Sequence, residues 1–170
     1  MAEGLTLYKL IILYMLRKVN FPLTNTQITS FMLEKNYTDY FHVQEALNDL
    51  VEAKLIVVEK IRNSSQYTAT VDGEQTLEYF NNEIPYPIKQ DTDSYLKENA
   101  FELRNESCTT ADYDMTDDGG YAVKCKVVEG HETVIELTIN VTSEAEAERV
   151  CLNWPEKSQE IYLDIMTKLL

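Results

Sequence analysis

The stretch LTNTQITSFMLEKNYTDYFHVQEALNDLVEAKLIVVEKIRNSSQYTATVDGEQTL, residues 23–77, decides the fold of the first half of the chain. It opens with Thr24, whose spacing to Gln27 predicts a capping box that satisfies free backbone N–H groups at a helix start. Ile28, Phe31 and Met32 give this helix a buried face. The polar segment 34–37 predicts the turn that follows it.

A second helix in this stretch is expected to begin at Thr38 or Asp39, because both are good N-caps. Its apolar residues recur at helical spacing and predict one buried stripe. They are Val43, Ala46, Leu47, Leu50 and Val51.

The apolar period then changes from that of a helix to that of a strand. Residues 55–61 and 66–69 predict two strands, and residues 62–65 predict the turn between them. Thr70 is expected to cap a further helix that buries Leu77 and Phe80.

A helix is also predicted ahead of this stretch, over residues 5–19. Its centre, Leu10–Leu16, is apolar all round, so we expect the domain and a partner subunit to bury it together. The order helix, helix, turn, helix, hairpin and helix within about eighty residues is typical of a winged helix-turn-helix.

The second half of the chain predicts a different architecture. Pro85 and Pro87 interrupt the preceding helix, and a linking helix is expected over residues 83–98. Beyond it the pattern predicts an antiparallel meander, with strands at Phe101–Leu103, Tyr121–Val128 and Val134–Val141. A helix capped by Ser143 is expected to break at Trp154-Pro155, and a last helix follows. The fold class is therefore α+β, with a winged helix over 1–82, the linking helix over 83–98 and an acidic α+β domain over 99–170.

Charge is distributed unevenly along the chain, whose formal net charge is −14. The residues up to Val71 include seven basic and seven acidic side chains, and the remainder holds eight basic and 22 acidic ones. This balance argues against a protein that coats nucleic acid over its whole surface, and it suggests two parts with different partners.

Two resemblances support this interpretation. The pattern Tyr67-x-x-Thr70-x-x-Gly73-x-x-x-Leu77 resembles the end of the wing in the PadR and MarR regulators. The whole chain resembles a bacterial domain-of-unknown-function family of this length with a winged-helix front. The segments that carry the second resemblance are Lys9–Tyr14, Pro22–Asn25, Leu33–Thr38, Tyr40-Phe41 and Ile84-Pro85. It implies a winged-helix fold and a regulatory role, and it supplies no ligand or binding residues.

A candidate surface for DNA lies opposite the buried stripe of the helix that begins near Asp39. Asn and Gln side chains pair with adenine edges, whereas Glu45, Asp49 and Glu52 would face a polyanion unless Glu45 accepts from a cytosine. The wing tip adds side chains suited to phosphate or minor-groove contacts. The predicted DNA-binding residues are Thr38, Phe41, Gln44, Glu45, Asn48, Lys60, Arg62, Asn63 and Ser64. The aromatic side chains of Tyr37, Tyr40 and Phe41 are expected to pack in the core or the turn, with stacking on a ligand or contact with thymine methyl groups as the alternative.

The expected function is control of transcription by a homodimer that binds duplex DNA. The C-terminal domain would hold the dimer together or sense a small-molecule or protein effector. The alternative is a protein–protein interaction module whose winged helix does not bind DNA. The first and linking helices are the expected dimer contacts.

No catalytic, metal or cofactor site is predicted. Asp114–Gly119 matches the first half of a calcium loop, but Cys125 stands where the loop requires a glutamate, so a solvated hairpin turn is expected. His42 and His131 lie in different predicted domains and suggest no catalytic arrangement. Cys108, Cys125 and Cys151 are expected to be free thiols in a reducing compartment. The apolar run at 10–16 is too short to span a bilayer and lacks a basic leader, so we expect a cytoplasmic protein.

Overall fold

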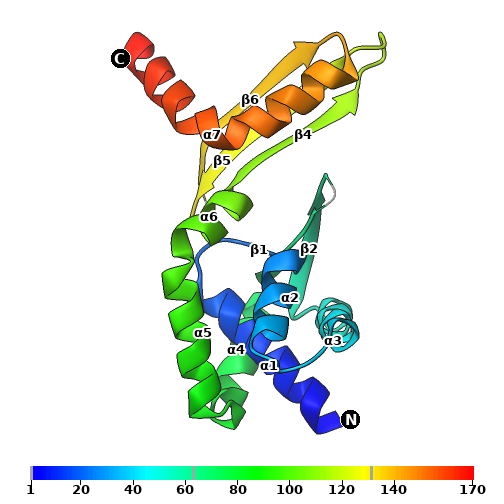
Figure 1. Cartoon of the computed structure of the whole chain (residues 1–170), viewed down its shortest axis with the longest axis vertical. Coiled ribbons are helices and arrows are strands. Elements are labelled where there is room, and N and C mark those ends of the chain that lie inside the picture. The colour runs from blue at the N-terminus through cyan, green and yellow to red at the C-terminus, as the bar shows by residue number, and fades with distance from the viewer. Residues whose placement is uncertain (1, 63, 131) are drawn as a thin grey trace. The chain divides into compact units, whose positions relative to one another are not determined.

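The computed structural model describes residues 2–62, 64–130 and 132–170, so Asn63 and His131 lie outside the described residues. The fold is mixed α+β, with two separate three-stranded antiparallel sheets (Figure 1). The chain divides into two units, each with its own hydrophobic core. The first unit contains residues 1–60 and 64–103, and the second contains residues 61–63 and 104–170.

Helices dominate the first unit, where one small sheet has the strand order β1-β3-β2. Leu23 of β1 lies opposite Tyr67 of β3, and Thr24 lies opposite Gln66. In chain order the elements are α1 (Ala2–Lys18), β1 (Leu23–Thr24), α2 (Asn25–Glu34), α3 (Tyr40–Glu52), β2 (Ile56–Ile61), β3 (Ser64–Ala69), α4 (Val71–Phe80), the 3₁₀ helix η1 (Asn81–Glu83), α5 (Tyr86–Glu98) and α6 (Ala100–Cys108). Of these, β2 belongs to the first unit up to residue 60 and α6 up to residue 103.

Side-chain caps fix where α2 and α3 begin. The predicted capping box is present, since the backbone N–H of Gln27 donates to Thr24 Oγ1 at 3.1 Å and the N–H of Thr24 donates to Gln27 Oε1 at 2.9 Å. Asp39, rather than Thr38, caps α3 by accepting from the N–H of His42 at 3.0 Å. Thr38 therefore precedes the helix.

The centre of α1 forms the middle of the first core. Each residue of Leu10–Leu16 is between 0% and 7% exposed, within a cluster that also contains Phe31 of α2, Leu47 of α3 and Leu77 of α4. The first unit thus covers all sides of this segment by itself. The expectation that a partner subunit is needed to bury it was wrong.

The junction between β3 and α4 explains the Thr70-x-x-Gly73 pattern. Thr70 Oγ1 accepts from the N–H of Gly73 at 3.1 Å and lies 2.8 Å from the carbonyl oxygen of Lys54, to which it donates. A Cβ atom on Gly73 would lie 2.0 Å from the carbonyl oxygen of Leu55. Only glycine therefore allows α4 to approach the start of the hairpin this closely.

Two tyrosine–aspartate hydrogen bonds attach α5 to the rest of the first unit. Tyr14 Oη of α1 donates to Asp93 Oδ1 at 2.9 Å, and Tyr37 Oη donates to Asp91 Oδ2 at 2.6 Å. Thr92, between the two aspartates, is fully buried. The predicted linking helix exists, and it packs on the core of the first unit.

The second unit is a three-stranded meander covered on one face by a helix. Its strands are β4 (Thr109–Met115), β5 (Tyr121–Glu129) and β6 (Glu132–Val141), in the order β4-β5-β6, and its helix is α7 (Glu144–Leu169). Cys125 at the centre of β5 lies opposite Ala111 of β4 and Leu137 of β6. Cys125, Cys151 and Trp154 belong to the core of this unit, and all three cysteines of the chain are free and buried.

The first strand of the meander was predicted at the wrong place. Phe101 and Leu103 belong to α6, and the meander starts at Thr109. Leu103 and Ser107 are buried four positions apart, a spacing that fits one face of α6, whereas Phe101 is exposed to solvent. The apparent strand alternation thus contained only one buried residue.

The predicted helix break at Trp154-Pro155 was also wrong, because α7 continues through Pro155. The capping box of Ser143 and Glu146 at its start is present. Pro155 removes one backbone donor, and Trp154 anchors the helix by donating from Nε1 to the carbonyl oxygen of Lys126 at 3.2 Å. Figure 1 shows that α7 bends after the half that lies along the sheet, as expected near an internal proline.

Smaller differences concern the hairpin and the end of α4. Ser64 and Ser65 belong to β3 rather than to the turn, and Phe80 is exposed rather than buried. In the described part of the chain, no helix has the length and apolar character required to cross a membrane.

Candidate nucleic-acid interface

The helix α3 exposes one face to solvent because its other face carries the predicted stripe. Val43, Ala46, Leu47 and Leu50 are buried in the first core. Tyr40, Phe41, Glu45, Asn48 and Glu52 are exposed, and Phe41 is 79% accessible. Tyr40 and Phe41 are therefore surface residues, and the expectation that they pack in the core was wrong. Tyr37, by contrast, is half-buried and packs against the first core.

Gln44 lies at the edge of this face, where its side chain is held by the protein itself. Its Oε1 accepts from Asn25 Nδ2 at 2.7 Å, and its Nε2 donates to Asn25 Oδ1 at 3.0 Å and to Thr29 Oγ1 at 3.2 Å. Asn25 Nδ2 also donates to the hydroxyl of Tyr67 in β3 at 3.3 Å. This network joins α2, α3 and β3, so Gln44 positions α3.

The first turn of α3 carries a second local arrangement. Nδ1 of His42 lies 2.9 Å from Asp39 Oδ1, and the His42 ring contacts the edge of Tyr8. The N–H of His42, which donates to the Asp39 carboxylate, holds the pKa of that carboxyl below its usual value. A negative charge is thus fixed at the start of α3, while the predicted site residue Thr38 is half-buried just before it.

No residue of α3 is a lysine or an arginine. Its acidic residues Glu45 and Glu52 are exposed, and Asp49 pairs with Lys9 of α1 at 2.8 Å. Cations for a phosphate backbone must therefore come from other elements. Lys35 caps the C-terminus of α2, and Lys60 is exposed on β2.

The predicted residues at the hairpin tip differ in their surroundings. Ser64 is half-buried at the start of β3, and Asn63 lies outside the described residues. Arg62 has a positive φ of 54° and belongs to the second unit. There its N–H donates to Asp112 Oδ2 at 3.0 Å, and its guanidinium lies 3.8 Å from Glu148 Oε1. Arg62 thus has acidic protein partners, whereas Lys60 is in no described ion pair.

A family model described as a domain of unknown function (DUF4364) matches residues 8–169, which include nearly all of both units. The chain belongs to the DUF4364 family. The resemblance to a domain-of-unknown-function family is therefore confirmed. A search of the curated proteins and a search of the solved structures each found no match to this DUF4364 chain.

When it is counted by structural unit, the net charge of the DUF4364 chain is evenly distributed. The first unit contains eight basic and fifteen acidic residues, and the second contains seven and fourteen, so each has a net charge of −7. The segment up to Val71, which has no net charge, does not form a unit by itself. The helices α4 and α5 and the start of α6 belong to the same unit, and they add acidic residues to it. Any anionic ligand of the first unit would meet an acidic protein with a few local cations.

Sequence reasoning missed Asn25 and Lys9 in this DUF4364 chain. Asn25 is the centre of the network that orients α3, and Lys9 neutralises Asp49. Asn25 is separated from Gln44 by 19 positions and from Tyr67 by 42. No local periodicity marks such pairings, so only the folded chain identifies them.

Proposed function

We propose that the first unit is a winged helix-turn-helix that binds duplex DNA, and that the protein regulates transcription. The observation that supports this proposal best is the element order α1, β1, α2, α3, β2, β3 with the sheet order β1-β3-β2. In helix-turn-helix proteins the second helix of the motif enters the major groove. Here that helix is α3, whose outer face is uncovered.

The role proposed for each residue follows from its exposure and its side-chain chemistry. Asn48 would pair with an adenine edge, Phe41 would contact a thymine methyl group, and Glu45 would accept from a cytosine amino group. Lys35 and Lys60 would contact phosphates. Gln44 would keep α3 in place and make no base contact.

The acidity of the first unit sets the expected strength of binding. Each phosphate that a lysine neutralises contributes about −0.9 to the slope of log affinity against log salt. Two lysines predict a shallow slope of about −2, so non-specific binding should be weak. Specificity would then depend mainly on base contacts from α3.

The test is fluorescence anisotropy of the full chain with pooled genomic duplex fragments at low and near-physiological salt. We expect binding that concentrates on a few fragments and weakens as salt rises. Lys60→Ala should weaken binding to all fragments and reduce the salt slope by about 1. Lys97→Ala removes the same charge from the exposed end of α5 and should leave both quantities unchanged. If neither fragment selection nor salt dependence is observed, the proposal is wrong.

A second candidate function is supported by the chemistry of α3 itself. An exposed pair of aromatic rings, Tyr40 and Phe41, lies on a helix without cations, and such a surface suits a protein partner. Under this alternative, DNA binding is absent even at low salt. Phe41→Ala would then abolish capture of a specific protein partner, whereas Lys60→Ala would not.

A further inference from the structure

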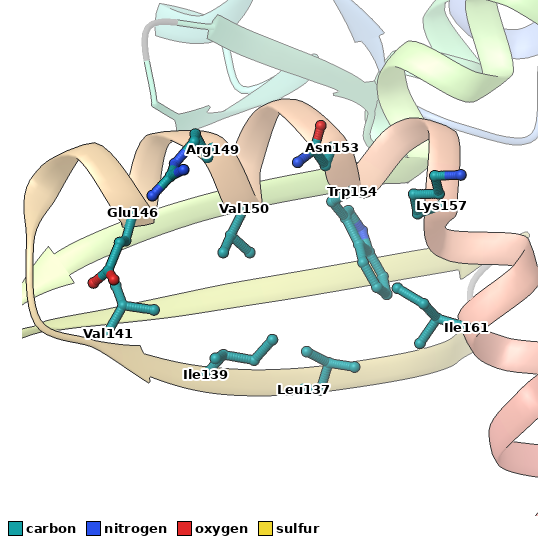
Figure 2. A pocket seen from close by; sticks show the side chains of 10 residues that line it. All are labelled: Leu137, Ile139, Val141, Glu146, Arg149, Val150, Asn153, Trp154, Lys157 and Ile161. Atoms are coloured by element: carbon teal, nitrogen blue, oxygen red, sulfur yellow. The ribbon is translucent and has the colours of Figure 1, made fainter.

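An apolar groove lies in the second unit between β6 and α7. Figure 2 shows Leu137 and Ile139 of β6 pointing toward Val150 and Trp154 of α7, with Ile161 at one end. The cavity volume is about 500 Å³, and its lining is mainly apolar. Ile139 on its floor is 42% exposed. The helix packs mostly over β4 and β5, so the apolar face of β6 is left open.

The same unit contains an apolar helix segment that is poorly covered. Seven of the ten residues at 161–170 are apolar, and the three polar ones, Asp164, Thr167 and Lys168, share one side of the helix. Leu169 is 77% exposed, and in the described part of the chain neither hydrophobic cluster includes any of residues 162–170. A helix that is apolar over most of its circumference requires burial.

Ile161 connects these two surfaces. It lines the groove, and it is also the first residue of the apolar segment 161–170. A two-fold axis beside Ile161 would place the apolar segment of each copy of the chain in the groove of the other. Both exposed apolar surfaces would then be buried by one self-complementary contact, as in isologous dimers.

We propose that the protein forms a homodimer in which residues 162–169 of one copy occupy the β6–α7 groove of the other. Two features of this chain favour a second copy over an unrelated partner. The groove and an apolar segment that lacks cover occur in the same unit, and α7 bends between the half that lies along its own sheet and its C-terminal half (Figure 1). This interface does not depend on DNA binding.

The oligomeric state of the full chain tests the proposal. Sedimentation velocity should give a mass of twice 19.6 kDa for the wild type. Leu169→Glu on the segment and Ile139→Glu in the groove should each weaken dimerisation by about 100-fold or more, because each buried charge occurs twice in a two-fold interface. Leu152→Glu is the matched control, since Leu152 is 69% exposed on the same helix and outside the groove. It should leave the dimer intact.

Cross-linking tests the contact directly. An equimolar mixture of the Ile139→Cys and Leu169→Cys chains, unfolded and refolded together, should form a disulfide-linked dimer upon oxidation, whereas neither variant should do so alone. The native cysteines are buried and supply no competing surface thiol. A monomeric wild type, or a dimer that Leu169→Glu and Leu152→Glu affect equally, would overturn the proposal. Circular dichroism of each variant checks that it is folded.

Discussion

At the scale of single residues, Gly73 is the position where a side chain is least tolerated. Gly73→Ala should lower the free energy of unfolding by about 3 kcal/mol, because the new methyl group collides with the backbone at Leu55 and neither backbone can move independently. Gly4→Ala is the matched control in the first turn of α1, where the nearest atom to a Cβ is 3.5 Å away. It should raise stability by about 0.5–1 kcal/mol through helix propensity. Urea denaturation of both variants measures the contrast, and equal effects would contradict this account.

The hydroxyl of Tyr14 makes the free energy of unfolding depend on pH in the alkaline range. Burial, and then the hydrogen bond to Asp93, raise its pKa from 10.0 to about 12. Because the pKa of Tyr14 is higher in the folded state than in the unfolded state, its protonated hydroxyl contributes to stability. That contribution is complete below pH 10 and is lost as pH rises from 10 to about 12. Burial and Asp91 likewise raise the pKa of Tyr37.

Tyr14→Phe should therefore cost about 1 kcal/mol at pH 8 and make stability fall less between pH 10 and 12. Tyr79→Phe, at an exposed position of α4, should change neither value. Thermal or urea unfolding across that pH range provides the measurement. A wild-type profile that Tyr14→Phe leaves unchanged would show that the hydrogen bond is not stabilising.

At the scale of elements, the orientation of α3 depends on one amide network. Gln44→Ala should cost about 1–2 kcal/mol, since it removes one hydrogen-bond partner from each of Nδ2 and Oδ1 of the partly buried Asn25. Asn48→Ala on the exposed face of the same helix should cost far less, and it should affect DNA selection instead. Urea denaturation and anisotropy together separate the two roles. If Gln44→Ala leaves stability intact but changes fragment selection, Gln44 contacts bases and its positioning role is wrong.

The elements that sequence predicts well are those whose evidence is local. Capping boxes at Thr24 and Ser143, the stripe of α3 and the period change at residue 55 each act over a few residues, and all of them are present. The failures have distant causes. Leu103 is buried in the core of the first unit, and Trp154 lies in the core of the second and donates to the carbonyl oxygen of Lys126, so both are held by residues that no local pattern links to them.

The candidate site shows the same contrast between local patterns, which predict well, and distant contacts, which do not. The helical wheel of α3 correctly exposes Phe41, Glu45 and Asn48, because periodicity determines which face is buried. It does not reveal that Gln44 is already bonded to Asn25 or that Asp49 is neutralised by Lys9. Such pairings depend on how helices meet, which no single-helix pattern contains.

At the scale of the whole molecule, two acidic units of equal net charge carry two separate proposals. The first unit would contact DNA through α3 and a few lysines, and the second would join two copies through β6 and α7. Salt titration of DNA binding and sedimentation of the Leu169→Glu variant test them independently. A variant that is monomeric yet still binds single half-sites would establish that the two activities belong to different units.

The complete burial of Leu10–Leu16 within one unit has an evolutionary consequence. A domain whose core needs no second subunit keeps its stability when the sequence attached to it changes. Mutation, recombination or loss in the region after residue 103 is therefore not constrained by the packing of α1.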